Sequence, residues 1–354
     1  MILRTFGWSF GLTALGLLLA LVLGGPSALF LVAILSILEI SLSFDNAVVN
    51  AKVLERMSPF WRRMFLTVGI AVAVFGMRIV FPLLIVGVTA RLNPAEAFDL
   101  ALNDGAAYGR ELHEAHPFIA AFGGMFLFML FLDFIFEERE HTWLSWLERP
   151  LARMGRLDHL SVIVAAAAMV VVAQTLADDV AGVMVAGVLG IVTYLLVNGL
   201  SDLFGSQDGR SRSSDVITAT GRAGFFLFLY IEILDASFSF DGVIGSFAIS
   251  HHIFIIAAGL GIGAVYIRSL TVYLVKTGAL SEFVYLEHGA HWAIGALAAI
   301  LLISIGQPIP EIVTGLIGVG FLGAAVTSSI LRKRRRLDDA SPSMRDQRLQ
   351  TSGV

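Results

Sequence analysis

Long apolar runs separated by short polar breaks dominate the chain. Reading the runs between the breaks gives ten segments, at 6–24, 28–52, 65–89, 117–136, 160–177, 180–202, 222–249, 252–275, 290–306 and 309–331. Most of them reach the roughly 20 residues that an α-helix needs to cross a bilayer core about 30 Å thick. The pattern predicts an all-α polytopic membrane protein with about ten transmembrane helices.

The charges between the runs support this count. Basic residues gather in alternate connections, at 53–64, 137–159 and 203–221 and in the tail that begins at Arg332. The connections between these are short or acidic. Because Lys and Arg accumulate in cytoplasmic loops, the alternation predicts a multi-pass protein with both termini in the cytoplasm.

The two ends and the two long connections are less apolar. Residues 1–25 are either a cleaved signal peptide or a first membrane helix, and the long run without a clear cleavage site favours the helix. The connections at 91–116 and 137–159 are long enough for amphipathic helices, and Trp143 and Trp146 suggest an interfacial helix in the second. The polar, Ser-rich tail, residues 332–354, is predicted to be a disordered cytoplasmic segment.

Composition narrows the class of protein further. Hydrophobic residues make up 57% of the chain and charged residues 15%, whereas soluble proteins average about 25% charged. The net charge of −4, with basic residues only in short clusters, argues against a nucleic-acid partner. There is no cysteine, so a bound metal would need oxygen or nitrogen ligands.

An internal repeat links the second and seventh runs. Residues 38–46 (LEISLSFDN) and 234–242 (LDASFSFDG) are identical at five of nine positions, and a sixth keeps a carboxylate. A glycine precedes an arginine by nine residues in the run after each copy, as Gly69 and Arg78 and as Gly259 and Arg268. The seventh run comes five runs after the second, an odd number, so the two copies cross the membrane in opposite directions. This predicts two inverted repeats, residues 1–179 and 180–331, with a substrate site at their interface near mid-membrane.

Acidic residues inside the apolar runs are the candidates for that site. A charge at the middle of a membrane helix costs at least about 2.5–3.5 kcal/mol, so such residues are usually functional. The acids and the oxygen-bearing residues beside them are Glu39, Ser43, Asp45, Asn46, Glu232, Asp235, Ser239 and Asp241. Carboxylates with hydroxyl and amide oxygens suit a hard divalent cation. Gly242 replaces Asn46 in the second copy, and we expect it to break the helix and free a carbonyl.

Several residues that are candidates for a functional role also have a purely structural interpretation. Arg78 and Arg268 are also intramembrane, so the acids either bind a cation or form ion pairs that specify packing. Asp133 lies near the inner end of the fourth run, with Glu137 and Glu138. These acids either form a cytoplasmic vestibule or gate, or simply belong to a solvated helix end. His288 and His291 are proton carriers or ordinary helix-end histidines.

Three motifs carry a resemblance to a known family. They are Ser41–Val49 (SLSFDNAVV), Asp235–Gly242 (DASFSFDG) and Glu287–Ala293 (EHGAHWA). The chain resembles the TerC-like integral membrane proteins, in particular the YkoY-type branch (bacterial domain of unknown function 475) within the lysine-exporter superfamily, from about Leu29 to Leu331. The resemblance implies a bacterial inner membrane and a link to manganese export and metal homeostasis. TerC proper is described with fewer spans.

Together these observations predict a carrier for a divalent metal cation, most simply manganese efflux by alternating access. Exporting one divalent ion against 100 mV costs nearly 5 kcal/mol, which proton entry through the same carboxylates would offset. No enzymatic activity or resident cofactor is expected, since the Gly-x-Gly-Asp motif of intramembrane aspartyl hydrolases is absent. The alternative is a membrane-embedded stress or assembly factor, associated with tellurite resistance, that binds a partner. The expected partners are the cation and the lipid bilayer, and a homo-oligomer is left open.

Overall fold

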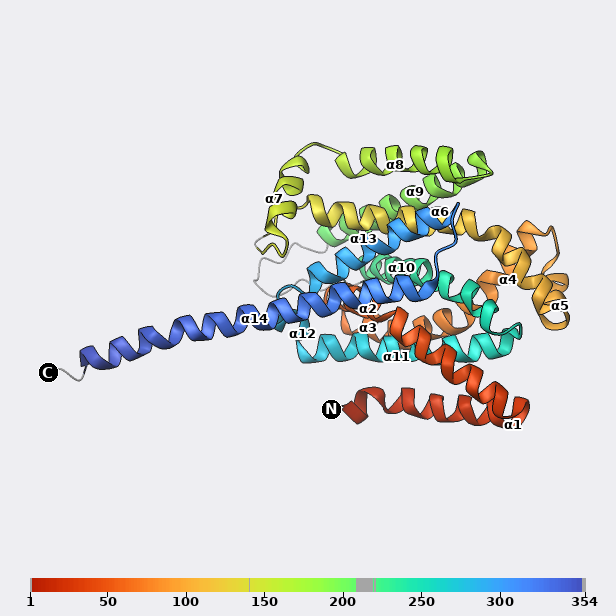
Figure 1. Ribbon diagram of the computed structural model, residues 1–354, viewed down its shortest axis with the longest axis horizontal. Helices are drawn as coiled ribbons and strands as arrows, with labels where there is room; N and C mark the ends of the chain where they lie inside the picture. The colour runs from red at the N-terminus through yellow and green to blue at the C-terminus, as the bar shows by residue number, and fades with distance from the viewer. Residues whose placement is uncertain (1, 140, 208–218, 220, 352–354) are drawn as a thin grey trace.

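The computed structural model describes residues 2–139, 141–207, 219 and 221–351, and it is built from helices (Figure 1). The first half holds α1 (Ile2–Leu42), α2 (Phe44–Glu55), α3 (Pro59–Ala71), the π-helix η1 (Val72–Val80), α4 (Phe81–Thr89), α5 (Pro94–Asn103), α6 (Gly105–Phe136), α7 (Ser145–Met154) and α8 (Leu160–Leu176). The second half holds α9 (Val180–Gln207), α10 (Gly221–Ile249), α11 (Ile253–Thr277), α12 (Ala279–Glu282), α13 (Leu286–Ser304) and α14 (Glu311–Thr351).

The predicted spans all fall on helices, which confirms an all-α polytopic fold. Among the described residues, seven helical segments are long and apolar enough to cross a membrane: Thr5–Leu42, Pro59–Thr89, Gly105–Phe136, Val180–Leu200, Ile253–Thr277, Leu286–Ser304 and Val313–Arg334. The first of them contains the first predicted span and most of the second, which continues into α2. The fifth predicted span is the shorter apolar helix α8, and the seventh is α10.

A sharp turn divides α1 into two limbs. Gly25 has φ +75° and ψ −170°, and Pro26 follows it. Glycine adopts a positive φ without a Cβ clash, and proline has no amide hydrogen for the helical ladder. The first limb therefore folds back, and α1 packs along α11 (Figure 1).

The two copies of the repeated motif have different backbones. In the first copy, Ser43 has φ −101° and ψ 17° and interrupts the helix between α1 and α2. In the second copy, α10 continues from Gly221 to Ile249, so the expected helix break at Gly242 is wrong. Within a membrane interior a continuous helix keeps every backbone hydrogen bond, and this outweighs the weak helix propensity of one glycine.

The motif-bearing segments run in opposite directions across the bundle. In Figure 1 the second limb of α1 runs from the turn on the right toward the left, whereas α10 runs from left to right. They meet inside a bundle in which α6, α11 and α13 are the most buried spans. The first limb of α1, α8 and α9 instead expose large apolar side chains, as expected for helices that contact lipid.

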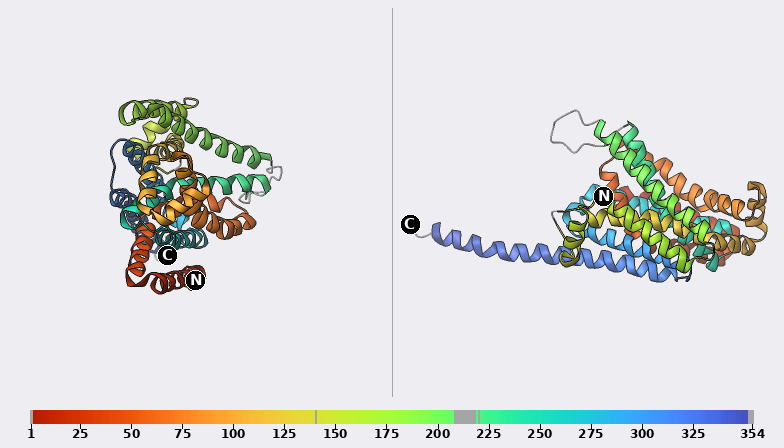
Figure 2. Two further views of the ribbon diagram at one scale, coloured as in Figure 1. Left: turned by 90° about the vertical axis from the view of Figure 1, so that its right-hand side faces the viewer. Right: turned by 90° about the horizontal axis from the view of Figure 1, so that it is seen from above.

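The connecting helices and the tail complete the fold. Helices α5 and α7 occupy the two long connections, as predicted. On the segment before α7, the Trp143 indole donates to the Ser328 hydroxyl of α14 at 3.1 Å, while Trp146 is 74% exposed. Helix α14 continues to Thr351 and projects beyond the bundle (Figure 2). The disordered cytoplasmic segment expected at residues 332–354 stays a prediction. Extending an existing helix avoids the cost of nucleation, and six of the residues from 332 onward are Arg, a good helix former.

Candidate cation site

The acidic residues of the repeated motifs lie inside the bundle. Relative exposure is 3% for Glu39, 5% for Asp45, 7% for Glu232 and 6% for Asp235. Asp241 lies in α10, but its side chain is outside the described part of the chain. The four described carboxyl groups therefore need partners from the protein or from a bound ion.

Glu39 is paired with Arg78. The Nη2 atom of Arg78 forms an ion pair with the Glu39 carboxylate and donates to the Ser239 hydroxyl at 3.3 Å. Its Nη1 atom donates to the carbonyl of Ala73. Arg78 lies in the π-helix η1, a wider helical turn that often occurs at functional sites.

The second half builds a similar pair around Arg268 on α11. Its Nη1 and Nη2 atoms each donate to Glu232 at 3.0 Å, and Nη2 also reaches Asp235 at 3.3 Å. The guanidinium stacks over the ring of Phe65 at 4.2 Å and donates to the Phe65 carbonyl at 3.0 Å. Gly69 lies directly beside this group, where a Cβ would overlap Arg268. One arginine thus serves two carboxylates.

Contacts also cross between the two copies of the motif. The Asn46 side-chain amide donates to Asp235 at 2.7 Å, and the bond from Arg78 to Ser239 crosses in the same way. Asn46 and Arg78 of the first half are therefore neighbours of Asp235 and Ser239 of the second.

Asp45 differs from the other acids. Its carboxylate accepts one hydrogen bond, from the backbone amide of Asn46 at 3.0 Å. Among the described residues, Asp45 forms no ion pair with a Lys, Arg or His nitrogen. A buried carboxylate without a cationic partner is costly, so this group is the natural place for a positively charged ligand.

A small central cavity lies against Asp45. Its volume is about 30 Å³, and its lining includes Glu39, Ser43, Asp45 and Thr314. Such a space holds a water molecule or a dehydrated ion. Thr314, on α14, was not predicted from the sequence, and its buried hydroxyl has no hydrogen-bond partner in the described structure. A threonine in an apolar run carries no sequence signal that separates it from an ordinary packing residue.

Two glycines lie beside the carboxylate oxygens of Glu39 and Asp45. A Cβ at Gly242 would lie 3.2 Å from the second carboxylate oxygen of Glu39, and one at Gly318 would lie 3.4 Å from Asp45 Oδ2. These oxygens therefore border backbone rather than bulky side chains. The cavity offers carboxylate and hydroxyl oxygens, which are the ligands that hard cations prefer. The described residues contain no group of three or more His, Asp or Glu placed to hold a metal, so a cation here would rely on hydroxyls and water as well.

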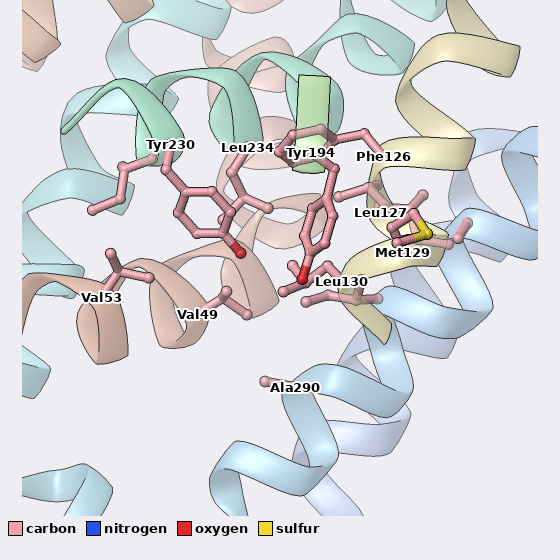
Figure 3. Packing of buried hydrophobic residues seen from close by; sticks show 14 of the residues in the cluster. Val49, Val53, Phe126, Leu127, Met129, Leu130, Tyr194, Tyr230, Leu234 and Ala290 are labelled. Carbon is pink, nitrogen blue, oxygen red and sulfur yellow. The ribbon is translucent and has the colours of Figure 1, made fainter. Parts of the chain in front are cut away.

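A larger inner cavity opens at the end of the bundle that carries the basic connections. It has a volume of about 410 Å³ and is lined in part by Asp133 and Glu137. The Tyr194 hydroxyl donates to Asp133 at 2.7 Å. Figure 3 shows Tyr194 and Tyr230 in the packed layer at this end, with their hydroxyl groups directed to the same side. Asp133 therefore belongs to a cavity of its own and not to the central one.

Ion pairs surround the inner cavity. Glu287, at the start of α13, binds Lys52 of α2 at 2.9 Å and Arg139 at 3.0 Å. Arg139 also binds Glu137 at 2.6 Å. The network joins the inner ends of α2, α6 and α13, which together surround the mouth of the cavity.

The rest of the Glu287–Ala293 motif anchors α7. Glu148 on that helix is 5% exposed and accepts from the Trp292 indole at 3.1 Å. His288 lies 3.6 Å from Glu148, and His291 stacks on Phe134 at 3.8 Å between ring centroids. Sequence reasoning missed Glu148 because it stands in a charged connection, where an acid is usually solvated.

An outer cavity of about 570 Å³ opens at the opposite end and is mostly apolar. Leu42 lines both this cavity and the central one, and it packs against Gly315 of α14. The inner and central cavities have no lining residue in common. Leu42 thus borders both the central cavity and the outer one, whereas no residue borders both the central and the inner cavity.

The chain belongs to the family described as "Protein of unknown function (DUF475)", whose model matches residues 44–336. The match begins at the first residue of α2, so it includes Asp45 but not Glu39. Neither a curated protein nor a solved structure matches the chain.

Proposed function

We propose that this DUF475 membrane protein is a carrier that moves a divalent metal cation through the central cavity in exchange for protons. The observation that carries the proposal is the buried Asp45 carboxylate, which has no cationic partner among the described side chains and borders a small cavity to which Glu39, Ser43 and Thr314 also contribute oxygen-bearing side chains. Asp45 would bind the ion, with Glu39, Ser43 and Thr314 as the other oxygen donors.

The local charge supports a divalent substrate. The four described acids, set against Arg78 and Arg268, leave a formal charge of −2 when every group is ionised. One divalent cation or two protons would balance that charge. Cation and protons therefore compete for the same oxygens, which is the requirement for exchange.

The arginine-paired acids have a different role in this scheme. Because Arg268 holds Glu232 and Asp235, these two carboxylates set the local field and the packing more than they supply free ligands. Glu39 pairs with Arg78 through one carboxylate oxygen, and its other oxygen borders the cavity. Asp235 and Ser239 hold the two halves together through Asn46 and Arg78. Rocking of the halves about these contacts would open the cavity to each side in turn.

The resemblance to TerC-like proteins makes manganese the first ion to test, and efflux across a bacterial inner membrane the first direction. The basic connections would then face the cytoplasm, as would both termini. Efflux against an inside-negative potential needs a driving force, and inward proton movement supplies one.

The test is Mn²⁺ flux into vesicles that contain the purified protein, followed with a trapped metal-sensitive dye under an imposed pH gradient. We expect a pH-dependent flux that Asp45→Asn reduces at least about 100-fold, since the variant keeps the shape of the side chain but removes its charge. The exposed acid Asp99 on α5 provides the matched control, and Asp99→Asn should leave the flux unchanged. Wild-type flux that Asp45→Asn does not alter would contradict the proposal. Absence of flux for Mn²⁺, Mg²⁺ and Ca²⁺ alike would favour the partner-binding alternative.

A further inference from the structure

Three buried polar atoms on α2 have no hydrogen-bond partner in the described structure. They are Oδ1 of Asn46 and both polar side-chain atoms of Asn50. Each residue is 1% exposed. Nearly all buried polar groups in proteins are paired, so an unpaired group indicates a bound water, an ion or a functional role.

The position of these atoms relates them to the cavities. Asn46 and Asn50 are four residues apart on one helix, so their side chains lie on the same face. Asp45, at the start of α2, lines the central cavity, whereas Val49, Lys52 and Val53 of the same helix line the inner cavity. Along the axis of α2, the two carboxamides therefore lie at the level between Asp45 of the central site and the residues that line the inner cavity.

Asn46 is already oriented by its neighbour. Its amide nitrogen donates to Asp235 at 2.7 Å, which fixes the carbonyl oxygen on the other side of the group. A carboxamide oxygen is a good neutral ligand for a hard cation. A neutral ligand also releases its ion more readily than a carboxylate does, as a position in a conduction path requires.

We propose that Asn46 and Asn50 form a second, transient binding position for the divalent cation, on the inner half of its path beyond Asp45. This inference rests on the proposed function. When the inner side opens, a partly hydrated cation leaving Asp45 would bind the two amide oxygens before it reaches the inner cavity. Water carried with the ion would accept from the Asn50 nitrogen.

The test uses Asn50→Leu in the Mn²⁺ vesicle assay, together with the thermal unfolding midpoint of the purified protein. A leucine of similar size removes the unpaired polar atoms, so the midpoint should stay the same or rise. If the side chain binds the ion, flux should nevertheless fall at least about tenfold. This combination of retained stability and lost flux is not expected of a packing residue.

Tyr108→Phe is the matched control. The Tyr108 hydroxyl is also buried and unpaired, but it packs against Phe247, outside the proposed path. Its removal should retain or raise the unfolding midpoint and leave flux unchanged. Equal flux in Asn50→Leu and the wild type would overturn the inference.

A second variant decides the matter should Asn50→Leu fail to fold. Asn50→Asp keeps the shape and adds a charge, so a true binding position would hold Mn²⁺ more tightly and lower both KM and kcat. Unchanged KM and kcat would overturn the inference. The proposed function fails separately, through the absence of wild-type flux or of an effect of Asp45→Asn in the same vesicles.

Discussion

Removal of Arg78 should be far more costly than removal of an exposed arginine, because it leaves a buried acid without its partner. The side chains of Arg78 and Glu39 are 1% and 4% exposed. Deleting one member of a buried ion pair costs about 3–5 kcal/mol, since the other charge remains desolvated. We therefore expect Arg78→Met to lower the free energy of unfolding by about that amount.

A control pair and a double variant isolate the cause. Arg156 and Glu138 form an ion pair at 2.8 Å with side chains 74% and 62% exposed, so Arg156→Met should cost less than about 1 kcal/mol. Glu39→Gln combined with Arg78→Met should recover at least about 2 kcal/mol of the loss, because no unpaired charge remains.

Reversible unfolding in mixed micelles, measured with and without about 1 M salt, provides the assay. Salt at this concentration screens exposed charges strongly but buried charges little, so only the Arg156 effect should shrink. The reasoning is refuted if Arg78→Met costs no more than Arg156→Met. It is also refuted if the losses from Glu39→Gln and Arg78→Met simply add.

Three further predictions follow from the site and its surroundings. Thr314→Val should raise the KM for Mn²⁺ about tenfold by removing a ligand oxygen, whereas Thr314→Ser should not, and equal values for both would exclude the hydroxyl as a ligand. Glu287→Gln removes the ion pairs with Lys52 and Arg139 around the inner cavity. A single cysteine introduced as Val53→Cys in this cysteine-free chain should then react with a maleimide several-fold faster from the inner side. An unchanged labelling rate would contradict the idea that these ion pairs restrict access to the cavity. Gly69→Ala should destabilise the fold by about 1–3 kcal/mol through overlap with the adjacent guanidinium, while Gly320→Ala, with nothing within 4 Å, should be neutral or stabilising in the same unfolding assay.

The repeated motif shows how far the sequence leads toward the candidate site. Two copies with buried acids, and an arginine at a fixed distance after each, were enough to predict that these residues lie close together. The sequence could not predict which acids are neutralised, because this depends on the position that each arginine side chain takes in the folded structure. Arg268 reaches two carboxylates and Arg78 reaches one, which leaves Asp45 without a cationic partner among the described residues.

A helix interruption was predicted in the second motif but occurs in the first, for a related reason. Glycine propensity suggested Gly242, but α10 is continuous there and the break occurs at Ser43. Helix propensity differs by about 1 kcal/mol between residues. Inside a membrane, this difference is smaller than the free energies of tertiary packing and of backbone hydrogen bonding, which therefore decide where a helix breaks. Thr314 and Glu148 were missed because their roles come from helices distant in sequence.

The sequence by itself determined that the protein spans a lipid bilayer, that it is helical, roughly where its spans lie and that costly charges lie at mid-membrane. Each of these follows from the local order of apolar and polar residues. Only the tertiary structure decided which charges are compensated, where the three cavities lie and that Thr314 joins Asp45. These depend on distances between side chains from separate helices, which packing fixes and local residue order does not encode.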